Sequence, residues 1–168
     1  FTRTFKNEES LFKGMVVAAS RREALFYQEE FEKMDELNTA VLISPGDERE
    51  GYDRVDDEST DELVAFFKKI EKKHGSVERY EDIMKKRFVH GDDLDIIIVV
   101  DKLLTGFDAP RATVLYVDKP MREHNLLQAI ARVNRQLDGK DYGFILDYRG
   151  LIKELNDAMA VYSGAGLD

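Results

Sequence analysis

A glutamine and two arginines recur at helical spacing in the segment LLQAIARVNRQ, residues 126–136. Gln128, Arg132 and Arg135 stand at i, i+4 and i+7, which predicts one shared polar face on a helix. The opposite arc of that helix holds Leu126, Ala129, Ile130, Val133 and Leu137. No acid stands four residues from either arginine, although the chain is rich in acids. Planar guanidinium groups bind phosphate oxygens well, so the pair favours an anionic ligand from outside; a solvated side of an amphipathic helix is the alternative.

A second polar group lies in LLTGFDAP, residues 103–110. Thr105 offers a hydroxyl and Asp108 a carboxylate. Gly106 permits a positive φ or close approach of the backbone to a ligand. A plain connection between two strands, made of turn residues, explains the same segment equally well.

Continuous apolar runs are expected to form the strands that position these groups, at 14–19, 39–44, 94–100, 112–118 and 142–148. Helices are expected from Ser20 to about Glu36, over 59–75 and 76–88, from about Arg122, and over 149–168. Apolar strands that alternate with helices predict an α/β fold, a parallel sheet with helices on both faces. We expect one domain over residues 1–168, with a flexible acidic loop at 44–60 and a last helix, 149–168, that leads to a next domain.

Ligands of such sheets bind at the carboxyl ends of the strands. Ser20 and Arg21 follow the first expected strand, residues 101–110 follow the third, and residues 119–125 follow the fourth. The polar groups are therefore expected to gather at one edge of the sheet.

Composition excludes several classes of protein. The chain has 168 residues, no cysteine and a net charge of -9, with 34 acidic against 25 basic residues. Disulfide frameworks, thiolate zinc sites and cysteine nucleophiles are excluded, and a free-standing DNA-binding protein is disfavoured. No apolar run approaches the ~20 residues that cross a bilayer, and no signal peptide is visible. We therefore expect a cytoplasmic protein without a membrane partner; because it opens at Phe1, we expect it to be a piece of a longer chain.

Groups needed for complete ATP chemistry are missing from the sequence. There is no G-x4-G-K-[ST] phosphate loop, since Gly139-Lys140 is followed by Asp141. Asp101 and Asp147 end apolar strands but are interpreted as turn or cap residues, so no metal site is predicted. Glu71 and Lys73 match a nuclease pattern on what reads as a solvated helix face. The chain alone is therefore not expected to hydrolyse ATP.

Three segments together resemble the motifs of superfamily-two helicases. Residues 128–135 (QAIARVNR) resemble motif VI, residues 105–110 (TGFDAP) motif V, and residues 14–21 (GMVVAASR) motif IV, in the right order within one domain. More narrowly, VVDKLLTGFDAP followed by QAIARVNR is similar to the motor (R) subunit of type I restriction endonucleases. The resemblance covers about residues 12–150. Ala131 and Asn134 stand where other families have glycines, which agrees better with the restriction branch.

The resemblance implies the second of two RecA-like motor domains, with ATP and Mg2+ held mainly by the preceding RecA-like domain. Arg135 would then act as the finger on the γ-phosphate, Arg132 as a second phosphate contact, and Gln128 would help hold the site. Asp108 would accept a hydrogen bond from the ribose or position an arginine, with Gly106 beside it.

For the remaining site residues, the resemblance implies that Ser20, Arg21 and Thr105, and also Gly106, lie against the backbone of double-stranded DNA. Modification and specificity subunits would complete the restriction complex, and a nuclease domain would lie upstream. Two alternatives remain open: a superfamily-two helicase or remodeller outside restriction, and an α/β binding module that does not use ATP.

Overall fold

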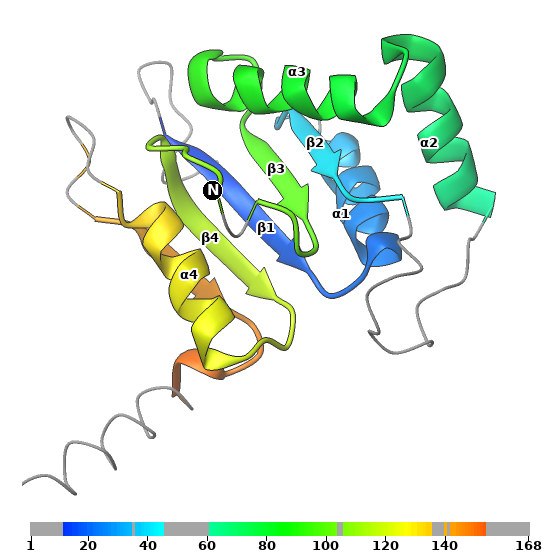
Figure 1. The fold of residues 1–168 in the computed structure, drawn as a ribbon. Coiled ribbons are helices and arrows are strands. Elements are labelled where there is room, and N and C mark those ends of the chain that lie inside the picture. The colour runs from blue at the N-terminus through cyan, green and yellow to red at the C-terminus, as the bar shows by residue number, and fades with distance from the viewer. Residues whose placement is uncertain are drawn as a thin grey trace, which may run out of the picture.

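The computed structural model describes residues 12–34, 36–45, 61–103, 106–135, 140 and 142–153. They form a five-stranded sheet in the order β2-β3-β1-β4-β5, and every pairing is parallel (Figure 1). The strands are β1 (Lys13–Ala18), β2 (Thr39–Leu42), β3 (Ile96–Val99), β4 (Ala112–Asp118) and β5 (Phe144–Asp147). The predicted α/β class is confirmed.

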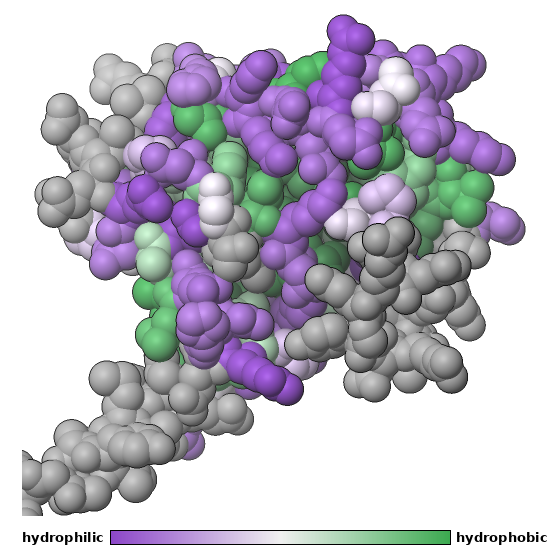
Figure 2. Space-filling model, in the orientation of Figure 1, coloured by the Kyte–Doolittle hydropathy of each residue, from purple (hydrophilic) through white to green (hydrophobic). Residues whose placement is uncertain are grey.

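The helices are α1 (Arg21–Met34), α2 (Asp61–His74), α3 (Val77–His90) and α4 (Glu123–Val133). α1 packs on one face of the sheet, where Ala24 and Leu25 join one apolar cluster with alternate residues of β1, β2 and β3. α3 and α4 supply Phe88 and Leu126 to a second cluster on the other face. β1 to β4 are buried on both faces over most of their length, which explains why their sequences show continuous apolar runs instead of alternation, whereas β5 at the edge of the sheet is partly exposed. Figure 2 shows mainly hydrophilic residues over the outer side of α3.

Two serines begin helices as the sequence predicts. Ser20 Oγ accepts a hydrogen bond from the Glu23 amide at 3.1 Å, and Glu23 Oε2 accepts one from the Ala19 amide at 3.1 Å, which closes a capping box before α1. Ser76 caps α3 in the same manner, through the Arg79 amide at 3.2 Å. These caps satisfy amide groups that have no partner within the helix.

Strand bounds differ from the expected ones at most ends. β4 spans the expected 112–118, whereas β2 stops at Leu42 and β5 covers only 144–147. Residues 46–60 of the expected acidic loop lie outside the described residues, as do residues 154–168 of the expected last helix, of which residues 151–153 are helical. No helix in the described part of the chain is long and apolar enough to cross a membrane.

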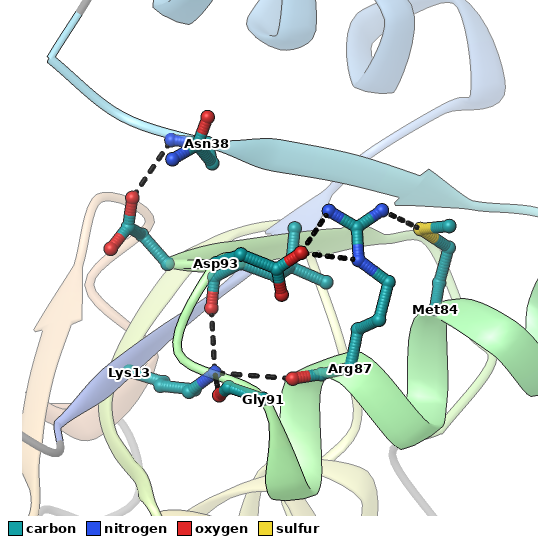
Figure 3. A network of polar contacts seen from close by, with 8 residues as sticks. Lys13, Asn38, Met84, Arg87, Gly91 and Asp93 are labelled. Atoms are coloured by element: carbon teal, nitrogen blue, oxygen red, sulfur yellow. Dashed lines mark hydrogen bonds and ion pairs between the residues drawn. The ribbon is translucent and has the colours of Figure 1, made fainter.

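Lys13, at the start of β1, is buried with only 2% of its surface exposed. Its Nζ donates hydrogen bonds to the carbonyl oxygens of Gly91 at 2.5 Å, Leu94 at 2.8 Å and Arg87 at 3.3 Å, at the end of α3 (Figure 3). The ammonium also lies 5.5 Å from the centre of the Phe88 ring. A cation at this place interacts favourably with the carbonyl end of the helix.

Lys140 is the second buried lysine, and its Nζ donates to the carbonyl oxygens of Pro110 at 2.8 Å and Ala112 at 2.7 Å. Burial, together with the positive charge of Arg111, lowers the pKa of Lys13 to about 8. Burial also lowers the pKa of Lys140 to about 8. Both ammonium groups are therefore harder to keep charged in the folded chain than in the unfolded one.

These two lysines predict that stability rises with pH between about 8 and 10. In that range the unfolded chain, whose lysines titrate near pH ~10.4, binds more protons than the folded chain, so the free energy of unfolding increases. Each lysine should contribute up to about 2–3 kcal/mol to this rise in the free energy of unfolding. Urea unfolding of this chain at several pH values measures the rise. Lys13→Met and Lys140→Met should each remove part of the rise. The prediction is contradicted if the free energy of unfolding rises with pH no more steeply in the wild type than in the double variant.

Above pH 10 the trend reverses. The pKa of Tyr27 and of Tyr80 is raised to about 12, in both cases first by burial. The unfolded chain then loses its tyrosine protons before the folded chain does, and stability falls.

Candidate functional site

The connection from β3 to β4 crosses the sheet face that α3 and α4 cover. Phe107 is buried and its ring centre lies 6.2 Å from that of Phe88 in α3. Ala109 is buried as well, and its carbonyl oxygen accepts a hydrogen bond from the Ala112 amide at 2.9 Å. Gly106 is exposed and has φ +70°, a value that favours glycine. The segment 106–109 is therefore anchored in the core by one aromatic ring while its polar groups remain at the surface.

Both arginines of the sequence motif reach this segment. Arg132 Nη1 donates a hydrogen bond to the Phe107 carbonyl oxygen at 2.7 Å, across 25 positions of sequence. Arg135 Nη1 lies 2.9 Å from Asp108 Oδ1. The structure thus brings Arg132, Arg135, Asp108 and Gly106 together, as neighbours of one loop.

The prediction of a single helical face for the three polar residues is wrong at its last member. α4 ends at Val133, and Asn134 caps it with φ -93° and ψ 23°, donating its amide to the Ile130 carbonyl. Arg135 therefore lies beyond the helix. Gln128 lies within it and pairs with His124, with 2.8 Å between the two side-chain nitrogens.

The expectation that all the polar groups gather at the carboxyl edge is also wrong. α4 follows β4 and runs back toward the beginnings of the strands, as a crossover between parallel strands must (Figure 1). Its last turn therefore lies away from the carboxyl end of β1, where Ser20 and Arg21 are found. The predicted residues form two groups, one at the end of α4 and one at the carboxyl edge. Thr105 lies outside the described residues.

Arg135 has an acidic partner, Asp108, which the spacing of residues close to Arg135 in the sequence could not reveal. The pair is open to water, because the Arg135 side chain is 45% exposed and that of Asp108 is 66% exposed. An ion pair of this kind contributes little net stability, on the order of 0–1 kcal/mol. The guanidinium group of Arg135 is therefore oriented by Asp108 but can exchange it for a stronger anion.

At the carboxyl edge, charged groups tie the strand ends to one another. Asp118, which ends β4, accepts a hydrogen bond from the Tyr27 hydroxyl of α1 and pairs with Arg149 Nε at 2.7 Å. Lys119 pairs with Asp101 at 2.7 Å, which joins the ends of β4 and β3. These contacts link α1 and the ends of β3, β4 and β5 at the edge where β1 also ends.

Asp147 confirms its interpretation as a cap residue. Its two carboxylate oxygens accept hydrogen bonds from the amides of Arg149 at 2.9 Å and Ile152 at 2.8 Å. Asp101 is occupied by Lys119 instead. In the described part of the chain there is no group of three or more histidine, aspartate or glutamate side chains that could hold a metal ion.

Two supporting contacts were missed by reasoning from the sequence. Phe107 anchors the loop, and its signal was present, since an aromatic residue within a polar loop indicates an anchor. Glu81, which is buried in α3, forms an ion pair with Lys102 at the start of the same loop. Nothing in the spacing of Glu81 and Lys102 points to that pair.

Comparison with known proteins gives consistent matches. The family model of type I restriction enzyme subunit R domain 3 matches residues 10–150. The chain is 38% identical over 163 residues to the MjaVIIP type I restriction enzyme endonuclease subunit of Methanocaldococcus jannaschii, covering 93% of this chain and 15% of the relative. It is 45% identical over 97 residues to the HindI endonuclease subunit of Haemophilus influenzae, covering 55% of this chain and 9% of the relative. The chain thus spans only a small part of the length of these relatives.

A solved structure shares the fold. The ATP-dependent Type ISP restriction-modification enzyme LlaBIII, solved bound to DNA, matches with a TM-score of 0.54 and 15% identity, over 86% of this chain and 9% of that one. The likeness supports the RecA-like arrangement of the sheet and its helices.

Proposed function

The chain belongs to the family of type I restriction enzyme subunit R domain 3, and from this premise we propose that it is the second motor domain of an ATP-dependent translocase of double-stranded DNA. The observation that supports this most is the pair of guanidinium groups, Arg132 and Arg135, that meets the exposed loop at Gly106 and Asp108. A motor needs cations of this kind to stabilise charge on a transferring phosphoryl group.

The two arginines fit a nucleotide in different ways. Arg132 is half-buried and fixed to the Phe107 carbonyl, so it is a positioned donor. Arg135 rests in a weak pair with Asp108, and a triphosphate carries more negative charge than a carboxylate and offers paired oxygens to the guanidinium fork. Arg135 is therefore the group that we assign to the γ-phosphate, and Arg132 to a second phosphate.

The remaining nucleotide contacts would come from the same neighbourhood and from another domain. Asp108, once released by Arg135, can accept a hydrogen bond from the ribose, with Gly106 beside it; Gln128 would help hold the site from α4. The phosphate loop and the ligands for Mg2+ are assigned to the preceding RecA-like domain. Closure of that domain onto the loop and the end of α4 would then switch hydrolysis on.

The second group of predicted residues would hold DNA. Ser20 and Arg21 lie at the carboxyl end of β1, and Thr105 stands between β3 and β4 in the sequence. Contacts to phosphates position a protein on a duplex without reading its sequence, which suits a translocase. Modification and specificity subunits would supply recognition of the target site.

The isolated chain should bind ATP only weakly, because it holds half of the site. Calorimetry with Mg2+-ATP should give a Kd above about 1 mM, equivalent to less than ~4 kcal/mol of binding free energy. Inorganic triphosphate is the control for simple attraction of an anion. A micromolar Kd for ATP would contradict the shared site.

A further inference from the structure

Helix α3 holds the connection from β3 to β4 at two places. Near the beginning of the connection, Lys102 donates a hydrogen bond to Glu81 and forms an ion pair with it. Nearer to its end, the Phe107 ring contacts that of Phe88, with 6.2 Å between the ring centres. Glu81 and Phe88 are seven residues apart, so they lie on one side of α3, about 10 Å apart along its axis. The helix therefore supports the connection on both sides of Gly106 in the sequence.

Glu81 is the charged member of the buried side of α3. The buried residues of this helix are Val77, Tyr80, Glu81, Met84 and Phe88. A buried carboxylate is costly unless a positive group pairs with it. Lys85, one turn later on the same helix, lies 3.6 Å from one carboxylate oxygen of Glu81, and Lys102 binds the other oxygen from 21 positions away. Because Lys85 is already available as a partner within the helix, the pair with Lys102 has the additional effect of tying the connection to α3.

The backbone next to Lys102 needs such a tie. Leu103 has φ +66°, in the left-handed region that residues with a side chain rarely adopt. A conformation of this kind persists only where the surrounding contacts determine it. The Leu103 side chain packs against the apolar cluster shared by α3 and α4, and the ion pair holds the residue before it. Without the ion pair, we expect the connection to relax toward more common backbone conformations.

The later part of the same connection holds both motif arginines. The Phe107 carbonyl oxygen accepts the hydrogen bond from Arg132, and Asp108 pairs with Arg135. A shift of the backbone near Leu103 would therefore move the partners of both guanidinium groups.

We propose that Glu81 is a positioning residue, which acts through Lys102 to hold the connection where it can place both arginines for phosphoryl transfer. This inference rests on the proposed function and adds to it a buried group on α3 that is not itself expected to touch nucleotide or DNA. Its effect should therefore be seen in the rate of the reaction more than in the binding of ATP.

Glu81→Gln and Lys102→Met each remove one side of the ion pair, and both are made in the longer protein that contains this domain. DNA-stimulated turnover of ATP should fall about 10–100-fold, the loss that a misplacement of ~1 Å can cause at a catalytic site. The KM for ATP should change by less than about threefold, because the preceding domain holds most of the nucleotide. If the two residues act as one unit, the double variant should lose no more turnover than the stronger single variant.

Two further variants are matched controls. Lys85→Met removes the other partner of Glu81 without changing the connection, and it should leave turnover unchanged. Lys102→Arg keeps a positive charge beside Glu81 and should keep at least about a third of the wild-type turnover. If Glu81 served only the stability of α3, Lys85→Met would lower turnover as much as Glu81→Gln does.

Cleavage by chymotrypsin without ATP or DNA tests the position of the connection independently of hydrolysis. Phe107 is buried and Leu103 is half-buried, so cleavage after either residue requires the connection to leave the core. Because the rate of cleavage follows the population of the open form, both variants that break the ion pair should be cut there about tenfold faster than wild type. Lys85→Met should be cut at the wild-type rate.

The outcomes separate this proposal from the motor function. Wild-type cleavage rates in Glu81→Gln and Lys102→Met overturn it, whatever their turnover. Faster cleavage with unchanged turnover overturns it as well, because the ion pair would then hold the connection without serving hydrolysis. Unchanged turnover in Arg135→Ala counts instead against the proposed function, and it leaves the cleavage rates of the Glu81 and Lys102 variants as they are.

Discussion

Replacing Arg135 by alanine, in the longer protein that contains this domain, should reduce DNA-stimulated ATP hydrolysis by about 10³-fold or more. An arginine contributed to the phosphoryl group from a separate domain is worth ~10³–10⁵ in rate. Binding of DNA at equilibrium should change by less than about threefold, because phosphate contacts elsewhere hold the duplex. Steady-state turnover with saturating DNA and a filter-binding titration measure the two quantities.

Arg87→Ala is a matched control for Arg135→Ala. Arg87 is also an arginine in a surface ion pair, 2.8 Å from Asp93, and its side chain is 41% exposed against 45% for Arg135. It lies on α3 and should leave turnover unchanged. If Arg135→Ala keeps turnover within a few-fold of wild type, or if both variants lose turnover equally, Arg135 does not stabilise the γ-phosphate.

Arg135→Lys should recover little of the lost rate. The ion pair with Asp108, at 2.9 Å, sets the position of the Arg135 guanidinium group before a nucleotide binds. Lysine would offer a point charge without the planar fork that fits two phosphate oxygens. We therefore expect that a positive charge at position 135 is not enough for hydrolysis. The planar guanidinium group, placed just beyond the end of α4, is needed as well.

The sheet could be predicted because its strands are apolar without interruption. β4 lies where the sequence places it, at 112–118. β2 was expected to be two residues longer, since Ile43 is buried as deeply as the strand itself but no longer pairs with β3. A pattern of burial cannot separate a buried strand residue from a buried residue that follows the strand.

The arrangement of the site was harder to predict, because its contacts join distant parts of the chain. Periodicity compares a residue with neighbours three or four positions away, so it identified Arg132 but not the Phe107 carbonyl that holds it, 25 positions earlier. It also extended the helix to Arg135, although Asn134 ends it. Helix ends depend on local capping and on the return of the chain to the next strand, and both are set by tertiary structure.

Phe88→Ala should produce the largest loss of stability of any single change proposed for this chain. Phe88 is fully buried at 0% exposure, and from α3 its ring contacts Phe107 and Lys13. Removing a ring from such a site costs about 3–5 kcal/mol through lost burial and the cavity left behind. A domain with ~5–15 kcal/mol of total stability would approach its limit, which urea unfolding at pH 7 measures directly.

Phe88→Leu separates loss of volume from loss of the ring and should cost less than half as much as the alanine variant. The alanine variant has a second expected effect, because its cavity admits water to Lys13. The pKa of Lys13 then returns toward its ordinary value, and the rise in stability between pH 8 and 10 becomes smaller. A loss under about 1 kcal/mol at pH 7 with the full pH-dependent rise retained would mean that the ring neither fills the core nor shields the ammonium. The loop assigned to the nucleotide would then need another anchor than the contact between Phe88 and Phe107.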